Sequence, residues 1–443
     1  MPVSIYYGGG TQFFDDSGNP LAGGSIDVYS PGTTTPIDSY KESSLTTPHT
    51  NPIVLDAYGR PPGGQIWFSG NVKTVVKTSG GVTVNGIGGD NLNPDQASAG
   101  TTTAPINYVV NGSFQIAQRG TSFTSTTTPA NTDDNYLIDQ WIYLSDGADV
   151  FDITQETSVA RLEPGCFNGI TFDVETANSK GGMLHVIDAK KTAALFKNAT
   201  GTCSLSFTAR AQNAGFDRIR AAVIAWTGTA DAVTSDIVSA WNAEGTNPSL
   251  VASWGYENTP VTLTTLTSTP QRFEIENILL DTSNTTNIGI FIWMDETSNT
   301  VTNLITVSAV QLEPTATASA YVQPPYSLEL WNCLEYLHRR TRITSSEGVL
   351  IQTCLSTTQA YGTYDHPREM RAAPTFSNST ASELEVADGG GLGVTLTAIA
   401  GSIITKNTTA ITTTVAAGLT IRDAVILRFR STANTFLQWS AEL

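Results

Sequence analysis

Threonine is the feature of this sequence that most constrains its fold, since about 65 of the 443 residues are Thr. A β-branched residue favours extended backbone, and the 38 Gly and 20 Pro supply turns between short strands. At roughly 150 residues per domain, the length predicts about three compact units. No apolar run reaches the roughly 18 residues that a membrane span needs. We therefore expect a folded, mostly β protein without membrane insertion.

The charge of the chain restricts its partners. The 23 Lys and Arg against 40 Asp and Glu give a net charge of −17. Phosphate backbones repel such a chain, so we expect no nucleic acid partner. Residues 1–10 lack the basic and apolar segments of a Sec signal, which predicts release from the producing cell by another route, such as lysis.

The N-terminal part, residues 1–95, is expected to be an independent β domain. Residues 71–78 are typical of a strand, and residues 82–84 alternate again after a Gly80-Gly81 pair that can turn a hairpin. Residues 96–105 have no apolar periodicity and are interpreted as a linker.

The central part, residues 106–326, is expected to be an antiparallel sandwich. Residues 272–276 alternate apolar and charged side chains, which predicts a strand with one face in water. Residues 205–210 alternate in the same way. Residues 287–294 are apolar on both faces, which predicts a strand buried on both sides.

One segment departs from the β pattern. Residues 327–340 place Leu330, Leu334 and Leu337 at i, i+4 and i+7, with Ser327 as a candidate N-cap and basic residues at the end. The pattern predicts a short amphipathic connector helix.

Beyond that helix, residues 341–443 return to strands. Val425, Leu427 and Phe429 alternate with charged residues, for example, and we expect a C-terminal β-sandwich. The predicted fold class is thus mostly β, with a small N-terminal domain, a central sandwich, one short helix and a C-terminal sandwich.

Catalytic and metal-binding motifs are missing from the sequence. It has no nucleophile elbow, phosphate-binding loop, HExxH motif or EF-hand, and its four histidines lie far apart. We expect no catalytic residue, no metal centre and no cofactor. A structural Ca²⁺ stays open as an alternative, held by side-chain oxygens of Asp133, Asp134 and Asn135 or of Asp146, Asp149 and Asp152.

The four cysteines are spaced too widely for a zinc motif or a dense disulfide scaffold. Cys166, Cys203, Cys333 and Cys354 are therefore predicted to be buried free thiols.

Aromatic residues are the candidates for binding sugars, because the apolar face of a sugar stacks on Trp or Tyr. Trp241, Trp254 and Tyr256 lie among polar residues and are the candidate glycan-binding residues, with core packing as the alternative. Trp226 follows an apolar run and is expected in the core.

A group of segments lies between residues 23 and 90: GSIDVY at 24–29, PGT at 31–33, PI at 36–37, NPIVLDAYGR at 51–60 and QIW at 65–67. They resemble the N-terminal virion-attachment domain of tail fibres and tailspikes of short-tailed bacteriophages. The resemblance implies an attachment motif that includes Asn51, Pro52, Asp56, Gly59 and Arg60. Asp56 can bond nearby backbone, while Gly59 can take a conformation that other residues avoid.

Further segments lie in the rest of the chain: NGSF at 111–114, QRGTSF at 118–123, DQW at 139–141, VQLEP at 310–314, the helical region around 333–336, MRAAPT at 370–375 and AEL at 441–443. The segments from 111 to 336 resemble the galactose-binding-type jelly roll, a carbohydrate-binding-module fold of many phage fibres, together with the helix that follows it. The last two resemble the fibre tip that follows such modules.

The resemblance implies a homotrimeric tail fibre in the virion tail. Its N-terminal domain would dock on a tail, adaptor or portal-complex protein, and its β modules would bind a host surface polysaccharide or lipopolysaccharide without catalysis. Two alternatives stay open: a polysaccharide-degrading tailspike and a purely structural tail adaptor.

Overall fold

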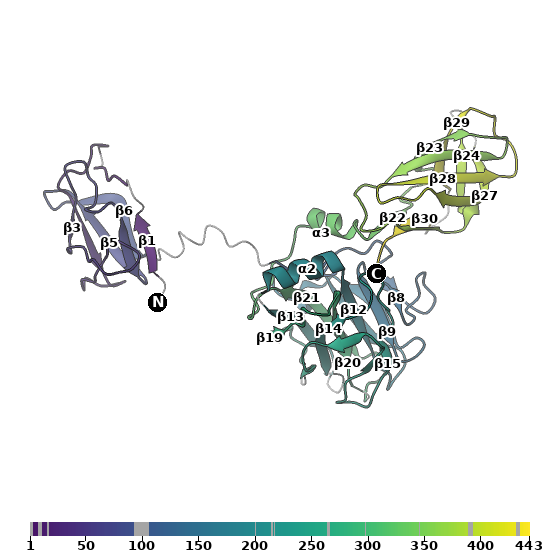
Figure 1. Cartoon of the computed structure of the whole chain (residues 1–443), viewed down its shortest axis with the longest axis horizontal. Coiled ribbons are helices and arrows are strands. Elements are labelled where there is room, and N and C mark those ends of the chain that lie inside the picture. The colour runs from purple at the N-terminus through teal and green to yellow at the C-terminus, as the bar shows by residue number, and fades with distance from the viewer. Residues whose placement is uncertain are drawn as a thin grey trace. The chain divides into compact units, whose positions relative to one another are not determined.

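The computed structural model describes residues 3–7, 11–15, 17–92, 106–199, 201–213, 216, 218–263, 266–296, 298–344, 346–388, 393–430 and 435–443. Contacts divide the chain into two compact units, Met1–Ala104 and Pro105–Leu443 (Figure 1). Strands dominate both units, which confirms the mostly β fold class. The predicted linker at 96–105 lies outside the described residues.

The N-terminal unit has one main sheet, and its core holds apolar residues of β2, β4 and β5. The strand order is β3 (Ile53–Val54), β2 (Ser25–Tyr29), β5 (Val72–Lys77) and β6 (Thr83–Leu92), while β1 (Val3–Tyr7) pairs with β4 (Ile66–Ser69). β5 and β6 form the predicted hairpin, and Gly81 in its turn has a φ of +80°.

The turn at residues 56–59 has the chemistry that the sequence predicts. Asp56 Oδ1 accepts the backbone N–H groups of Tyr58 at 2.8 Å and Arg60 at 2.9 Å. Gly59 has a φ of +71°, and a Cβ there would lie 2.5 Å from the carbonyl oxygen of Phe13. Both predictions about this turn are therefore confirmed.

Asn51 holds the edge of β2 through its side chain. It accepts the N–H of Val28 at 3.1 Å and donates to the carbonyl oxygens of Val28 at 2.6 Å and Ile37 at 3.1 Å. Asn51 and the 56–59 turn thus stabilise the domain internally, although Asn51, Pro52, Asp56 and Arg60 are all exposed.

In the second unit, two antiparallel sheets pack face to face as the predicted sandwich (Figure 1). Their orders are β19-β13-β21-β11-β10-β7 and β17-β14-β20-β12-β9-β8, with β18 beside β14. Strands that are adjacent in the chain cross between the sheets, as in a jelly roll. The bounds are β7 Ser122–Phe123, β8 Asn135–Tyr136, β9 Trp141–Ser145, β10 Phe151–Glu156, β11 Gly169–Val174, β12 Gly181–Ile187, β13 Thr202–Ala211, β14 Ile219–Trp226, β17 Trp254–Tyr256, β18 Val261–Leu263, β19 Gln271–Leu279, β20 Asn287–Met294 and β21 Leu304–Glu313.

The burial of the central strands follows the predicted pattern in two of three cases. β20 is buried on both faces: Ile290 lies between the sheets, while Phe291 and Trp293 pack in a second cluster with Ile237. β19 keeps Glu274 and Glu276 in water, while Arg272 is largely covered and donates to Ser206 at 2.8 Å. β13, which alternates in sequence, is nearly all buried because other parts of the chain cover its polar face, as where Glu163 accepts a hydrogen bond from Thr208 at 2.5 Å.

A helix that the sequence analysis did not predict, α2 (Ala189–Asn198), follows β12. Asp188 caps it, since its Oδ1 accepts the N–H of Lys191 at 2.9 Å, and Leu195 is buried in the sandwich core. No helix in the described parts of the chain is long and apolar enough to cross a membrane.

The predicted helix over 327–340 begins within one residue of the observed start but is too long at its C-terminal end. α3 covers only Tyr326–Cys333 and follows Pro325, and Ser327 is not its N-cap. Leu337–Thr341 form a strand, β22, which pairs with β30 (Phe436–Ser440) near the chain terminus. Leu337 fits a helical spacing in the sequence, but pairing with residues 436–440 places it in a strand instead. A local sequence pattern does not indicate such a long-range pairing.

The C-terminal part is a closed barrel with a small sheet beside it, not the predicted sandwich. The barrel order is β23-β24-β28-β27-β26-β29, and β29 closes it by pairing with both β23 and β26. Val425, Leu427 and Phe429 of β29 point into the barrel core, as their alternation predicts. The bounds are β23 Gly348–Cys354, β24 Gln359–Asp365, β25 Thr375–Asn378, β26 Leu384–Ala387, β27 Gly393–Ser402, β28 Thr408–Val415 and β29 Ala424–Phe429.

Gly59→Ala should destabilise the N-terminal unit by about 1–3 kcal/mol, because the added Cβ meets backbone at a positive φ. Hydrogen exchange of peptides from residues 11–92 of the full chain measures the loss. Gly80→Ala is the control, since that glycine has no close backbone neighbour. Equal protection in both variants would contradict the role given to Gly59.

Candidate functional site

The small sheet β22-β30-β25 has two chemically different faces. Side chains alternate along a strand, so His338 and Arg339 of β22 point to opposite sides. His338 stacks on the buried Trp439 of β30, with ring centroids 5.3 Å apart, and burial lowers the pKa of His338 to about 4. Tyr364 stacks on Trp439 at 4.3 Å. This face is therefore an aromatic cluster that attaches the sheet to the barrel.

The other face of the sheet forms one wall of a cleft of about 820 Å³. The jelly roll supplies the opposite wall from residues 117–128. This volume falls within the roughly 300–1,000 Å³ of small-ligand sites. The lining residues are Ala117, Gln118, Arg119, Gly120, Ser122, Thr126, Thr127, Thr128, Arg339, Thr341, Asn378, Ser379, Thr380, Glu383 and Phe436.

Arg339 is held firmly inside this cleft. Its guanidinium carbon lies 3.7 Å from the centroid of the Phe436 ring, and its Nη1 donates to Gln438 Oε1 at 3.2 Å. Its backbone N–H donates to Gln118 Oε1 at 3.0 Å. Burial, with Arg119 close by, lowers the pKa of Arg339 to about 10, so the guanidinium is still charged at pH 7.

Apart from Arg119, Arg339 and Glu383, the polar side chains that line the cleft are hydroxyls and amides. Thr and Ser hydroxyls can donate and accept, as can the amide of Asn378, whereas the Gln118 amide already donates to Asp139 and Leu337 and accepts from Arg339. Together with the Phe436 ring and one guanidinium, they form a surface that can hydrogen-bond many hydroxyl groups on a ligand.

A buried ion pair holds the floor of the cleft. Arg119 pairs with Glu442, and the side chains are only 7% and 3% exposed. The Arg119 Nη1 donates to Glu442 Oε1 at 3.1 Å. Beside it, Asp139 accepts both N–H groups of Gln118, while burial, opposed by Arg119, raises the pKa of Asp139 to about 6. Tyr136 donates to the carbonyl oxygen of Leu443 at 2.6 Å, which fixes the chain terminus.

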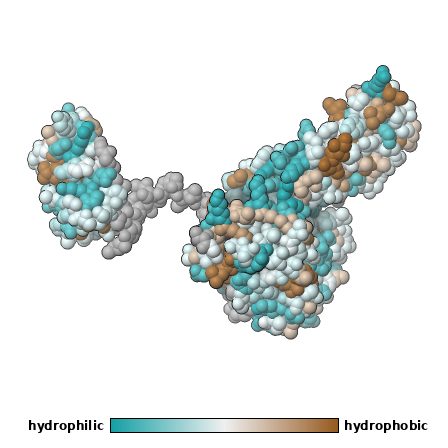
Figure 2. All heavy atoms as spheres, viewed as in Figure 1, coloured by the Kyte–Doolittle hydropathy of each residue, from teal (hydrophilic) through white to brown (hydrophobic). Residues whose placement is uncertain are grey.

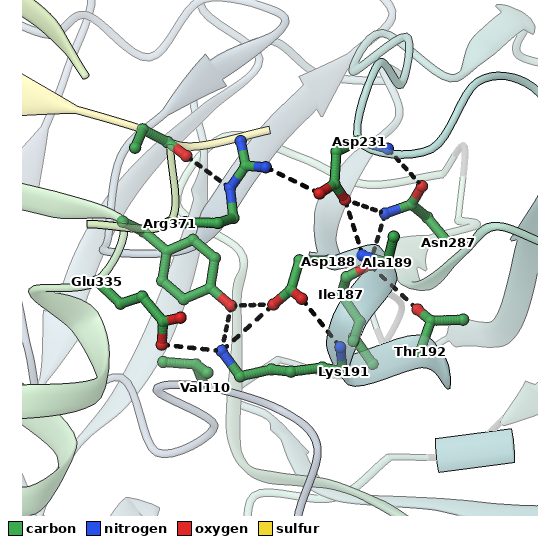
Figure 3. A network of polar contacts seen from close by, with 12 residues as sticks. Val110, Ile187, Asp188, Ala189, Lys191, Thr192, Asp231, Asn287, Glu335 and Arg371 are labelled. Carbon is green, nitrogen blue, oxygen red and sulfur yellow. Dashed lines mark hydrogen bonds and ion pairs between the residues drawn. The ribbon is translucent and has the colours of Figure 1, made fainter. Parts of the chain in front are cut away.

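A second polar network joins the jelly roll to the C-terminal part (Figure 3). At its centre, Tyr336 donates to Asp188, and Lys191 lies 3.3 Å from Asp188 and 3.4 Å from Glu335. This network therefore joins the jelly roll to the C-terminal part, in addition to the Arg119–Glu442 pair.

Arg371 makes contacts in both directions within this network. It pairs with Asp231 of the jelly roll at 3.1 Å and donates through Nε to the Ala441 carbonyl oxygen at 2.9 Å. Asp231 accepts from Asn287 at 2.8 Å (Figure 3). Arg371 lies in one of the segments that resemble a phage-fibre tip, and in this structure it connects the jelly roll to the last residues of the chain.

The three aromatic candidates from the sequence lie together, away from the cleft lining. Trp254 is buried and donates from its indole nitrogen to the Thr234 carbonyl oxygen at 2.9 Å. Trp241 and Tyr256 are half-buried against the same cluster, and the Tyr256 hydroxyl donates to the Pro248 carbonyl oxygen. Trp226 is buried, as predicted. A sugar-contacting role for Trp241, Trp254 and Tyr256 stays a prediction, and the burial of Trp254 gives it a place in the core.

Other aromatic and apolar residues are more exposed than these candidates. Trp331 of α3 is 49% exposed, with Arg368 5.5 Å from its ring. Hydrophobic residues also gather on the barrel surface (Figure 2), where Ile351 and Ile426 face each other across β23 and β29 and are 71% and 42% exposed. No sequence pattern predicts these residues or the cleft, because strand alternation alone does not say which face of a strand water reaches.

Carboxylates gather on one edge of the jelly roll. Asp152 of β10 lies directly opposite Asp173 of β11, with Asp149 and Glu175 nearby. Desolvation, helped by these like charges, raises the pKa of Asp152 to about 6. No group of three or more His, Cys, Asp or Glu side chains in the described residues is arranged for a metal, so the structural Ca²⁺ stays a prediction. All four cysteines are buried and free, as predicted.

No protein-family model and no curated protein matches the chain. Solved structures with similarity to it include the enzymatically active domain of bacteriophage CBA120 tailspike protein 4, at 12% identity and a TM-score of 0.29, over 47% of this chain and 21% of that one. This chain therefore spans about a fifth of the tailspike structure.

Two carbohydrate-binding modules are similar at the same level. One is the C-terminal family 22 module of Clostridium thermocellum Xyn10B, at 10% identity and a TM-score of 0.27, over 48% of this chain and 99% of that one. The other is a module of the β-sandwich superfamily, at 10% identity and a TM-score of 0.28, over 70% and 98% of the two chains. None of these likenesses assigns an activity to this chain.

Arg119→Met should lower the free energy of unfolding by about 3–5 kcal/mol, because it leaves the Glu442 carboxylate buried and unpaired. Denaturant unfolding measures the loss. Arg161→Met is the matched control, since Arg161 is 42% exposed in its ion pair with Glu156 and its loss should cost about 1 kcal/mol or less. Equal losses would contradict the importance of the buried pair.

Asp152→Asn should raise the melting temperature more at pH 7 than at pH 4. The raised pKa means that the fold disfavours the ionised carboxyl, so stability present below the ordinary pKa of 3.8 is lost as the pH rises through about 6. The amide cannot ionise and avoids this loss. Thermal unfolding at several pH values measures the difference.

Asp281→Asn is the control of opposite sign for that pH series. Hydrogen bonds from Ser283 lower the pKa of Asp281, so its stabilising effect is present above the ordinary pKa and is lost as the pH falls through the lowered one. A pH-independent effect of Asp152→Asn would contradict the raised pKa of Asp152.

Proposed function

We propose that this chain is a structural tail-fibre protein of a short-tailed bacteriophage that binds a glycan on the host surface. The observation that carries the glycan-binding part is the cleft between the jelly roll and the sheet β22-β30-β25. Its hydroxyls and amides match the hydroxyl groups of a sugar chain, and the Arg339–Phe436 stack offers a flat surface beside them.

The structural contacts around the cleft support binding with little rearrangement. The Arg119–Glu442 pair and the Tyr336–Asp188–Lys191 network join the jelly roll to the C-terminal part, so a ligand meets a largely formed site. A site that is already ordered loses less conformational entropy when a ligand binds.

The virion end of the fibre is assigned to the N-terminal unit. Gly59 is buried and shapes that domain, and the exposed residues Asn51, Pro52, Asp56 and Arg60 are the part of the motif that a tail, adaptor or portal-complex protein would contact. The protein would be a homotrimer, with the exposed Ile351–Ile426 pair of the barrel as one apolar surface for a second copy. Three weak sites on one fibre raise avidity.

The role is binding, without catalysis and without a cofactor. A polysaccharide-degrading tailspike and a purely structural adaptor are the alternatives. Incubation of the purified protein with host surface polysaccharide, followed by an assay for new reducing ends, separates the first alternative from binding, and release of oligosaccharides would overturn the non-catalytic part of the proposal.

Thr126→Trp should reduce binding to host surface polysaccharide by at least about tenfold. Thr126 is exposed in the cleft wall, and an indole there fills the space that a sugar would occupy. Binding to immobilised polysaccharide or a glycan array measures the effect. Thr353→Trp is the control, since Thr353 is exposed on β23 and does not line the cleft.

Two outcomes would contradict the cleft as the site. Unchanged binding by Thr126→Trp would exclude it. If Trp331→Ala loses binding while Thr126→Trp still binds, the glycan site lies on the exposed face of α3. If the wild-type protein binds virion proteins but no glycan, the purely structural adaptor role replaces the glycan-binding role.

A further inference from the structure

The charge of the cleft differs from the charge of the chain. The protein carries −17 overall, yet two arginines line this one cleft. Arg119 is neutralised by Glu442. Most ion pairs among the described residues involve an arginine. Arg339, in contrast, has no acidic side chain of the described residues within ion-pair distance.

The contacts of Arg339 leave its charge uncompensated. Gln438 and Phe436 hold the guanidinium in place, but an amide oxygen and an aromatic ring balance a full positive charge only in part. The Nε–H of Arg339 is buried without a hydrogen-bond partner. A half-buried guanidinium in this state interacts strongly with an anion that reaches it, because little water screens the contact.

The neighbouring charges restrict where an anion can bind. Asp139 lies beneath the cleft floor and already accepts from Gln118, and its effect on Arg339 is smaller than that of desolvation and of Arg119. Glu383 lines the cleft as well and repels an anion from its own part of the wall. The anionic group is thereby directed to Arg339, and Glu383 is left to accept hydroxyl donors.

We propose that Arg339 makes the cleft selective for a glycan that carries an anionic group, a carboxylate or a phosphate, over the same glycan without it. This inference rests on the proposed function, because it names the ligand class of the same cleft. Arg339 binds the anion and the hydroxyl and amide lining binds the rest of the sugar. A preference for an anion is compatible with the net negative charge of the protein. Salt screens the long-range repulsion between the protein and the glycan, but it screens the direct contact between Arg339 and the anion much less.

The test compares ligands that differ only in charge. Oligogalacturonate and its methyl ester form the carboxylate arm, and an oligomannose with and without a phosphate monoester forms the phosphate arm. Titration calorimetry with the full-length protein should give at least about tenfold tighter binding of one charged member over its neutral partner. The arm in which this occurs identifies the anion.

Arg339→Gln should abolish that preference, because the affinity for the charged member falls to about the affinity for its neutral partner. Lys190→Gln removes the same charge from the exposed start of α2 and should keep the preference. Comparable binding of charged and neutral members to the wild type would overturn the inference, while the proposed glycan-binding function would stand. Absence of all glycan binding, here and on the array, would overturn both. Because the wild-type comparison is itself decisive, the test stands even where Arg339→Gln fails to fold.

Discussion

The buried ion pair between Arg119 and Glu442 is the contact on which the second unit depends. It joins a residue near the start of the jelly roll to the penultimate residue of the chain. Removing two charges from water is costly, and good geometry with further hydrogen bonds must offset that cost. The two guanidinium–carboxylate contacts and the terminal Tyr136–Leu443 bond provide this geometry. Together with the pairing of β30 to β22 and β25, it holds the last strand beside the jelly roll.

The small sheet β22-β30-β25 forms one wall of the cleft beside this ion pair. β30 lies between β22 and β25 and ends only a few residues before Glu442. One face of the sheet is an aromatic cluster around Trp439 that belongs to the barrel, while the other carries Arg339 and Phe436 into the cleft. A strand places neighbouring residues on opposite faces, so a single β22 serves the core and the cleft together.

Local chemistry was predictable wherever neighbours in sequence decide the structure. The 56–59 turn needs only a carboxylate and a glycine, and the double burial of β20 is visible in its apolar run. Prediction failed where distant segments compete. Leu337 continues a helical pattern in the sequence but lies in β22, because pairing with β30 about a hundred residues later satisfies its backbone. Trp254 stands among polar residues in the sequence and is still buried, because strand pairing places it against Trp226.

The sequence by itself determined the mostly β class, the turn chemistry of the N-terminal domain and the two-sided burial of the central strand. All of these follow from residue type and spacing over fewer than about ten positions. Only the tertiary structure decided the candidate site. Its walls come from residues 117–128, 339–341, 378–383 and 436, and contacts across such separations depend on how the whole chain packs. For the same reason only the fold shows that Arg339, one of 23 basic residues, lies half-buried in a cleft without an acidic partner in the described part of the chain.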